Sequence, residues 1–357
     1  MRKIIYILSC FVFLTMLSTP VSAKNDEVDI IGNSAIVEDV ETGKVLYEKN
    51  INEKLYPASI TKIMTALVVL QEKNLDDKVT FSEEALNSIE SGSSAAYIKP
   101  GEIMTIEQSL YVMMLHSAND VAHGLAYDVG GDLAGFADMM NQKAVQLGCK
   151  NTHFVNASGL NDSNHYTTAS DMAKIAKAAY DNKTLRTIME TERYELPATN
   201  KNSTVRPWIN GNRMINSEYY YEPCLGGKTG YTMAAGGTLV TYAKINGRVL
   251  ECIILKSTNS VSAYEDSIKL YDYVKDHADF SVFEKTIDQE KTVDKIVEST
   301  EMEKILYEQG SKKLKTVILA FKIAVVIFVI LCISVIFKVV QSQKRKRRRH
   351  QRMKKRR

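Results

Sequence analysis

The chain has 357 residues, of which 45% are hydrophobic and 25% are charged, so it is long enough to bury a sizeable core. The formal net charge is +4, but 11 of the 46 basic residues follow residue 340 and 2 lie within the first 23, which leaves 33 basic against 42 acidic residues elsewhere. We expect no nucleic-acid partner, because the excess of basic residues lies in a C-terminal tail beside a predicted membrane span. Cys149, Cys224 and Cys252 include no close pair, and the histidines lack metal-ligand spacing, so we expect no disulfide framework and no metal.

The first 23 residues have the three parts of a secretory signal. Arg2 and Lys3 supply positive charge, residues 4–17 are apolar, and small residues precede a predicted cleavage after Ala23. We therefore expect the mature protein to begin near Lys24, outside the cytoplasm.

Residues 34–49 alternate apolar and polar side chains around residues 41–44, which predicts two short strands joined by a tight turn. A mostly buried helix is expected to begin near Ser59, because Pro57 suits a helix entry and the following apolar run lacks Gly and Pro. The patterns then stay mainly helical to about residue 180, and Thr105 and Gln108 have the spacing of a capping box.

After about residue 200 the chain returns to strand patterns. Residues 238–243 and 248–255 flank Asn246-Gly247, a strong hairpin signal, and a last helix is expected at residues 263–275. Strands from both ends around a helical middle predict a single mixed α+β domain at residues 28–275. Its sheet should combine N-terminal and C-terminal segments.

The composition changes abruptly after this domain. Residues 281–315 are charged and predict a stalk, whereas residues 316–340 begin with a 22-residue apolar run that is interrupted only by Lys322, as in a transmembrane helix. Residues 341–357 are strongly basic, which is typical of a cytoplasmic tail beside a membrane span. We therefore expect a single-pass protein of the cell membrane whose folded domain faces outward.

Ser59 and Lys62 form a Ser-x-x-Lys pair at the start of the predicted helix. Residues three apart on a helix share one face, so the lysine amine can reach the hydroxyl. A serine hydroxyl becomes a good nucleophile only when a neighbouring base takes its proton, and a lysine of lowered pKa can be that base. Taken alone, the pair is also compatible with a helix-capping serine and a surface lysine.

Further motifs follow this pair in a fixed order. Ser-x-x-Lys, Ser-x-Asn and Lys-Thr-Gly together resemble the penicillin-binding proteins and serine β-lactamases. The sequence around these motifs resembles the low-molecular-weight D-alanyl-D-alanine carboxypeptidases of serine peptidase family S11. The resemblance lies in Ala58-Ser59-Ile60-Thr61-Lys62-Ile63-Met64-Thr65-Ala66, His116-Ser117-Ala118-Asn119-Asp120, Phe154-Val155-Asn156-Ala157-Ser158-Gly159-Leu160, His165-Tyr166-Thr167-Thr168-Ala169 and Gly227-Lys228-Thr229-Gly230-Tyr231-Thr232.

The resemblance implies a β-lactamase/transpeptidase-like fold with an antiparallel sheet and a helical subdomain. It also implies removal of the terminal D-alanine from peptidoglycan stem peptides that end in D-Ala-D-Ala, covalent inhibition by β-lactam antibiotics, and no cofactor. Ser59 would attack the carbonyl between the two D-alanines, Lys62 would act as the base, and Ser117 would relay a proton to the leaving amine. By similarity, the backbone N–H groups of Ser59 and Tyr231 would form the oxyanion hole.

Five further residues would bind the substrate. Asn119 would hydrogen-bond the substrate amide, while Lys228 and Thr229, on an edge strand, would hold the terminal carboxylate. Gly230 has no side chain to block the substrate's approach to that strand. Arg213 matches a family arginine that supports the Lys228 region.

Three nearby residues that could be mistaken for catalytic groups are expected to be structural. His116 and His165 are expected to orient loops by hydrogen bonds, and Asp120 is expected to brace the Ser117 loop.

Two other functions fit the same motifs. A class A β-lactamase would need a Glu-x-x-Leu-Asn string to position its deacylating water, and none occurs between Asn119 and Lys228. A catalytically silent wall-binding or morphogenetic protein would have no chemical need for all the motif residues. The chain also departs from the usual family sequence at Asn156-Ala157-Ser158-Gly159, where we expect altered loop packing. Many family members carry a β-rich domain after the catalytic one, whereas here only about 35 residues, 281–315, precede the predicted span.

Overall fold

The computed structural model describes residues 28–90, 92–281 and 283. The predicted signal, almost all of the stalk, the spanning segment and the basic tail lie outside the described residues. Within the described part, no helix is both long and apolar enough to cross a membrane.

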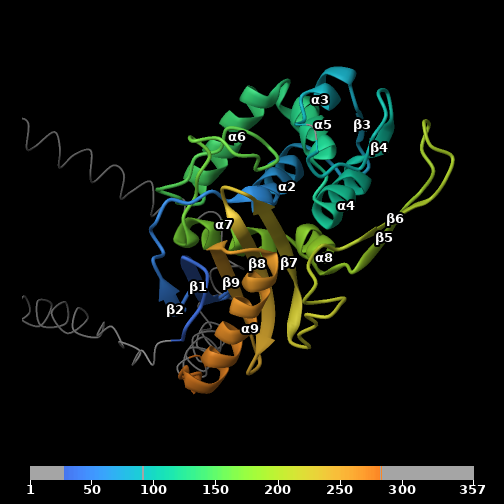
Figure 1. Cartoon of the computed structure of the whole chain (residues 1–357). Coiled ribbons are helices and arrows are strands. Elements are labelled where there is room, and N and C mark those ends of the chain that lie inside the picture. The colour runs from blue at the N-terminus through green and yellow to red at the C-terminus, as the bar shows by residue number, and fades with distance from the viewer. Residues whose placement is uncertain (1–27, 91, 282, 284–357) are drawn as a thin grey trace, which may run out of the picture. The chain divides into compact units, whose positions relative to one another are not determined.

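A five-stranded antiparallel sheet lies at the centre of the domain, in the order β2-β1-β9-β8-β7 (Figure 1). Residues from β1 pair with β9 from Ser34↔Leu255 to Asp39↔Leu250, so the two ends of the domain are joined by main-chain hydrogen bonds. The predicted sheet of N-terminal and C-terminal segments is thereby confirmed. Its strands are β1 Ser34–Asp39, β2 Val45–Lys49, β7 Cys224–Thr232, β8 Gly236–Ile245 and β9 Arg248–Ser257.

The two predicted hairpins are present. Asn246 and Gly247 have φ angles of 48° and 81°, the left-handed conformation that a two-residue turn between β8 and β9 requires. Asn and Gly tolerate this conformation best, so the dipeptide predicted the turn correctly.

Helices cover both faces of the sheet. α9 (Ser260–His277) packs on one face, where the Tyr271 hydroxyl donates to the Thr241 carbonyl at 2.9 Å. On the other face α7 (Ala169–Asp181) lies behind the sheet, and the Tyr242 hydroxyl donates to the Ala176 carbonyl at 2.7 Å (Figure 1). The Thr241 side chain also bonds the Ser267 hydroxyl of α9 at 2.9 Å, so neighbouring side chains of β8 point to opposite faces, as strand geometry dictates.

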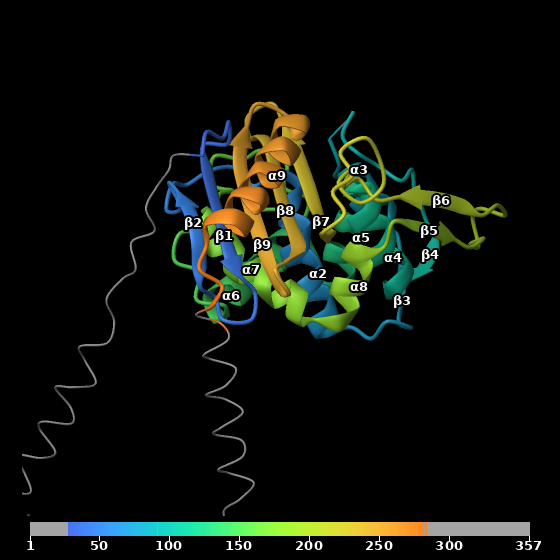
Figure 2. The same cartoon turned by 90° about the horizontal axis from the view of Figure 1, so that it is seen from below.

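The remaining helices form a second, helical half of the domain. The elements outside the large sheet are α2 Thr61–Glu72, α3 Glu83–Asn87, α4 Ile106–His116, α5 Asn119–Gly130, α6 Leu133–Gln146, α8 Lys183–Glu190, and the short hairpin strands β3 Lys78–Thr80, β4 Ile103–Thr105, β5 Arg193–Leu196 and β6 Arg206–Ile209. Of these helices, α3, α4, α5 and α8 lie on the β7 side of the sheet, whereas α6 lies towards β1 and β2 (Figures 1 and 2).

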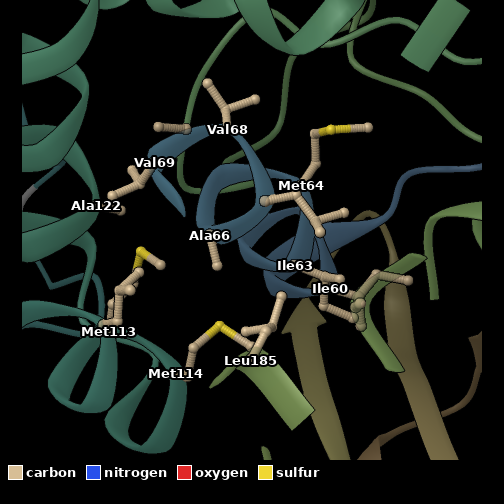
Figure 3. Close-up of a cluster of buried hydrophobic side chains, with 14 of the residues drawn as sticks. Ile60, Ile63, Met64, Ala66, Val68, Val69, Met113, Met114, Ala122 and Leu185 are labelled. Atoms are coloured by element: carbon tan, nitrogen blue, oxygen red, sulfur yellow. The ribbon is translucent and has the colours of Figure 1, made fainter. Parts of the chain in front are cut away.

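Helix α2 is enclosed by this half. Its side chains face Met113 and Met114 of α4, Ala122 of α5 and Leu185 of α8 (Figure 3), and nine of its residues are buried. Burial on nearly all sides explains the long apolar run after Ser59, because a helix with no solvent face needs no polar stripe.

The start of this helix differs in detail from the prediction. Ser59 lies in a 3-10 turn, Ala58–Ile60, and the α-helix begins at Thr61. The Thr61 N–H donates to the Ala58 carbonyl three residues back, which tightens the chain at this point. The capping box ahead of α4 is present as predicted, with Thr105 and Gln108 bonding reciprocally.

Glu251 is a buried carboxyl residue of the central sheet. It is fully buried on β9, opposite Glu38 of β1 and next to Tyr242 of β8. Burial, together with the charge of Glu38, raises the pKa of Glu251 well above its usual range; Lys177 opposes this shift and Asp181 adds to it. The carboxyl therefore keeps its proton in the folded protein at a pH where the unfolded chain has lost it.

We expect the folded state to lose stability as the pH rises, through Glu251. Because the folded pKa lies above the unfolded value near 4.5, this contribution is complete below that value and disappears as the pH approaches the raised folded pKa. Glu251→Gln removes the titration, so its melting temperature should exceed that of the wild type at about pH 8, by a margin that shrinks towards about pH 5. Exposed Glu265→Gln is the control; a margin independent of pH would contradict the assignment.

Candidate active site

The turn that holds Ser59 is clamped from two sides. The Thr238 hydroxyl of β8 donates to the Pro57 carbonyl at 2.8 Å. On the other side Gly159 lies so close that an added Cβ would fall 1.9 Å from the Ala58 oxygen. Ala58 itself has a φ of 50°, which a residue with a side chain rarely adopts. Sheet and loop together hold Ala58, the residue before Ser59, in a backbone conformation that local preference would not choose.

The Lys62 amine is fully buried and has three partners. It lies 3.1 Å from Ser59 Oγ, 2.7 Å from Asn119 Oδ1 and 2.7 Å from the Ser158 carbonyl oxygen. The last two atoms can only accept, so they take two N–H groups of the amine. The hydroxyl can donate, and it can therefore point its hydrogen at the lone pair of a neutral amine. This arrangement suits a base beside a nucleophile.

The electrostatics favour the same protonation state. Burial lowers the pKa of Lys62 well below its usual range, and the nearby charge of Lys228 lowers it further, while Asp120 acts in the opposite sense. Burial also lowers the pKa of Lys228 to about 7. Burial and the charge of a second buried lysine therefore keep Lys62 available as a proton acceptor.

Ser117 occupies the end of α4 in a left-handed conformation, with φ 62° and ψ 30°. Its hydroxyl oxygen is enclosed, and among the described residues it has no hydrogen-bond partner. A buried hydroxyl without a partner is unusual in a folded protein and is compatible with a role in which the hydroxyl serves a substrate. Two residues on, Asn119 opens α5 and bonds Lys62, so the structure brings the first two motifs together.

The nearby ionisable groups have structural partners, as predicted. The Asp120 carboxylate accepts hydrogen bonds from the backbone N–H groups of Ala96 and Ile98. His116 bonds the Ala95 carbonyl at 3.2 Å, and His165 accepts from the Val155 N–H through Nδ1 and contacts Thr61 through Nε2. Burial lowers the pKa of His165 to about 4, so the ring stays neutral and orients its loop.

The third motif lies on β7, which is an edge strand of the sheet. Lys228 is 2% exposed, and its amine donates to the Thr229 carbonyl at 2.9 Å. Gly230 also has a packing reason to lack a side chain: a Cβ there would fall 2.4 Å from Thr238 Oγ1 and 2.8 Å from the Ser59 nitrogen. The missing side chain thus lets β7 pack against the Ser59 turn, and the role of Gly230 in substrate access stays a prediction. Tyr231 follows and is 52% exposed.

A hollow of about 420 Å³ continues from Thr229 and Tyr231 towards the first turn of α9. Arg213 lines it and forms an ion pair with Glu218, with 2.9 Å between Nη1 and Oε1. An arginine beside a threonine hydroxyl is a suitable arrangement for a carboxylate. The role of Arg213 in supporting Lys228 stays a prediction.

The loop at residues 156–160 contributes a group that the motifs did not indicate. Asn156 Oδ1 accepts from the N–H groups of Ser158 and Gly159, and this turn aims the Ser158 carbonyl at Lys62. His123 lies behind it, 3.3 Å from Ser158 Oγ. The sequence of this loop differs from the one usual in the family. The acceptor that it supplies to Lys62 is a backbone carbonyl, which almost any residue can provide. Only the Asn-x-Ser-Gly turn signal could have suggested this role.

A serine held against a buried lysine amine, between a sheet edge and a helical half, defines the class of serine–lysine acyl-transfer enzymes. A family model described as D-alanyl-D-alanine carboxypeptidase matches residues 19–259. The chain therefore belongs to peptidase family S11, the D-alanyl-D-alanine carboxypeptidases, and the resemblance inferred from its motifs is confirmed.

Individual relatives agree with this family. The D-alanyl-D-alanine carboxypeptidase DacF of Bacillus subtilis is 35% identical over 255 residues, which are 68% of this chain and 63% of that protein. The corresponding enzyme of Streptomyces strain K15 is 34% identical over 65% of this chain and 83% of its own length. This chain thus spans less than two thirds of the Bacillus protein.

Solved structures share the fold. The Streptomyces K15 DD-transpeptidase superposes with a TM-score of 0.64 at 31% identity, covering 69% of this chain and 98% of that one. The D-alanyl-D-alanine carboxypeptidase from Mycobacterium tuberculosis gives 0.63 at 29% identity, covering 69% and 91%. The predicted α+β architecture with an antiparallel sheet is confirmed.

Proposed function

We propose that this protein is a serine-type D-Ala-D-Ala carboxypeptidase that removes the terminal D-alanine from peptidoglycan stem peptides. The observation that carries this proposal is the contact between Ser59 Oγ and the buried Lys62 amine, whose other two hydrogen bonds are to acceptors. Family membership supplies the substrate class.

The reaction has two halves. Ser59 Oγ attacks the carbonyl carbon between the two D-alanines while its proton moves to the Lys62 amine. The C–N bond then breaks, and the proton passes through the Ser117 hydroxyl to the departing amine, so that D-alanine leaves and an ester remains on Ser59. A water molecule next attacks that ester, Lys62 takes its proton, and the shortened peptide and free hydroxyl are released.

The remaining side chains would bind the substrate. The backbone N–H groups of Ser59 and Tyr231 would stabilise the oxyanion, and removing one such donor from an enzyme typically costs about 3 kcal/mol of transition-state stabilisation. Asn119 would bond the amide of the acyl part. Lys228, Thr229 and Arg213 would hold the terminal carboxylate, and the same carboxylate of a β-lactam would occupy that position.

The direct test is to incubate the detergent-solubilised full-length protein with a pentapeptide that ends in D-Ala-D-Ala and to weigh the products. We expect loss of one alanine and addition of one water. A relative in Pseudomonas aeruginosa is named D-alanyl-D-alanine endopeptidase, at 30% identity. Cleavage of a cross-linked dimer without release of free D-alanine would therefore overturn the carboxypeptidase assignment in favour of that activity.

The Michaelis constant for such a peptide should depend on pH through Lys228. Since the pKa of its amine is about 7, the charge that attracts the substrate carboxylate is present below this pH and is lost above it. We expect KM to rise between about pH 6 and pH 9, and a peptide with an amidated C-terminus should show no such rise. The same pH trend with both peptides would contradict this role.

We further propose that residues 1–23 are a cleaved signal, that residues 28–275 are the enzyme domain, and that residues 281–315 are a stalk. Residues 316–340 would span the cell membrane as one helix, with the basic tail 341–357 in the cytoplasm. The abrupt change from charged to apolar to basic sequence supports this organisation. Extraction from membranes by carbonate, or removal of the tail by protease outside intact cells, would count against it.

A further inference from the structure

Tyr97 combines two features that are costly for a tyrosine. Its backbone φ is 55°, a left-handed conformation that is a true outlier for a bulky residue. Its side chain is also 84% exposed, so the fold gains little from burying the ring. Strain of this kind persists only where the surrounding structure enforces it, and it gathers at functional sites.

The other strained residues show where such strain lies in this protein. Six residues other than glycine have positive φ in the described part, and two of them are asparagines, which tolerate it. Of the remaining four, Ala58 precedes the nucleophile and Ser117 is itself a motif residue. Tyr97 and Lys256 complete the set.

Tyr97 is held by the residue that follows Asn119. The buried Asp120 carboxylate accepts from the N–H groups of Ala96 and Ile98, each at 3.0 Å, on either side of Tyr97. One carboxylate thus fixes the backbone on both sides of Tyr97, whose side chain is exposed.

The same segment is tied to the loop that carries Ser117. The Asn119 N–H donates to the Ser94 carbonyl at 2.8 Å, and the Ser94 hydroxyl donates to the His116 carbonyl at 3.0 Å. These bonds fix the backbone of the segment that leads to Tyr97 against the backbone on either side of Ser117. The backbone around Tyr97 is therefore bonded directly to the segment that carries Ser117 and Asn119.

We propose that the Tyr97 ring is a specificity-determining surface of the site, which packs against the acyl part of the substrate. This inference rests on the proposed carboxypeptidase function. The leaving D-alanine is directed towards Thr229 and Arg213, whereas Tyr97 belongs to the Asn119 side, where the stem-peptide residues before the D-Ala-D-Ala pair would lie. An exposed phenol ring offers an apolar face for their aliphatic chains and peptide planes.

The test compares two substrates and two variants. Tyr97→Asn removes the ring and suits the left-handed backbone, and Tyr97→Phe keeps the ring. For the D-Ala-D-Ala pentapeptide we expect Tyr97→Asn to lower kcat/KM about tenfold, mainly through KM, while Tyr97→Phe stays close to wild type. For acetyl-D-Ala-D-Ala, which lacks the packed residues, both variants should match the wild type.

Thermal unfolding supplies a second readout. Tyr97→Asn should leave the melting temperature unchanged or raise it by roughly 2–4 °C, because strain is relieved and little burial is lost. A lower melting temperature, an unchanged pentapeptide kcat/KM, or an equal loss with both peptides would each overturn the inference. If the wild type releases D-alanine from neither peptide, the proposed function falls and the inference with it. If the wild type is active and both variants have the kcat/KM of the wild type, only the inference about Tyr97 is overturned.

Discussion

Ser59→Ala is expected to abolish D-alanine release and to prevent labelling by penicillin. The hydroxyl that forms the ester would be gone, and the Ser117 hydroxyl does not have the Lys62 contact that Ser59 Oγ has. Loss of a nucleophile of this type lowers the rate by about 10⁴-fold or more. Release can be followed with a pentapeptide, and labelling with a fluorescent penicillin on denaturing gels.

The wild type should keep its label through denaturation, because the adduct is an ester whose hydrolysis no Glu-positioned water assists. Exposed Ser163→Ala is the matched control and should label normally. Rapid turnover of penicillin by the wild type would indicate a β-lactamase. An absence of labelling in correctly folded wild type would indicate the silent wall-binding protein, and label without D-alanine release would sink the carboxypeptidase assignment.

Lys62→Met is the second change with a large expected effect. The variant keeps a buried chain of similar length but has no base within reach of Ser59 Oγ, so kcat should fall by roughly 10²–10⁴-fold with KM little changed. Its acceptors, Asn119 Oδ1 and the Ser158 carbonyl, lose a donor, which costs about 1–3 kcal/mol each if they find no other. The substitution also removes the desolvation cost of burying an amine, and this gain offsets part of the loss.

The pH profile separates a base from a merely structural lysine. The wild type should gain activity as the pH rises through the lowered pKa of Lys62, since only the neutral amine accepts the proton. In Lys62→Met the residual rate should not show this rise with pH. Exposed Lys183→Met serves as the control and should retain the wild-type profile. A rise with pH that survives in Lys62→Met would assign the base to another group.

Local patterns in the sequence predicted much of the fold. The alternation at residues 34–49, the Asn246-Gly247 turn and the Thr105 capping box each depend on neighbours within a few residues, so they are visible without a structure. The same reasoning placed Lys62 on the face of Ser59. The order of three short motifs then identified the family, and the candidate site residues followed from it.

Other features depend on residues that are distant in the chain. The Lys62 amine bonds Asn119 and Ser158, which are 57 and 96 residues away in the chain. The acceptor of Ser158 is its backbone carbonyl, which no side chain in the sequence indicates. Gly230 packs closely against the turn that holds Ser59, and the Asp120 carboxylate bonds the backbone on both sides of the strained Tyr97. Both contacts join residues that are far apart in the sequence. The sequence by itself determined which local elements form and which chemical groups are available. Only the tertiary structure decided how they are buried, strained and paired, because those energies come from contacts that the chain makes after it has folded.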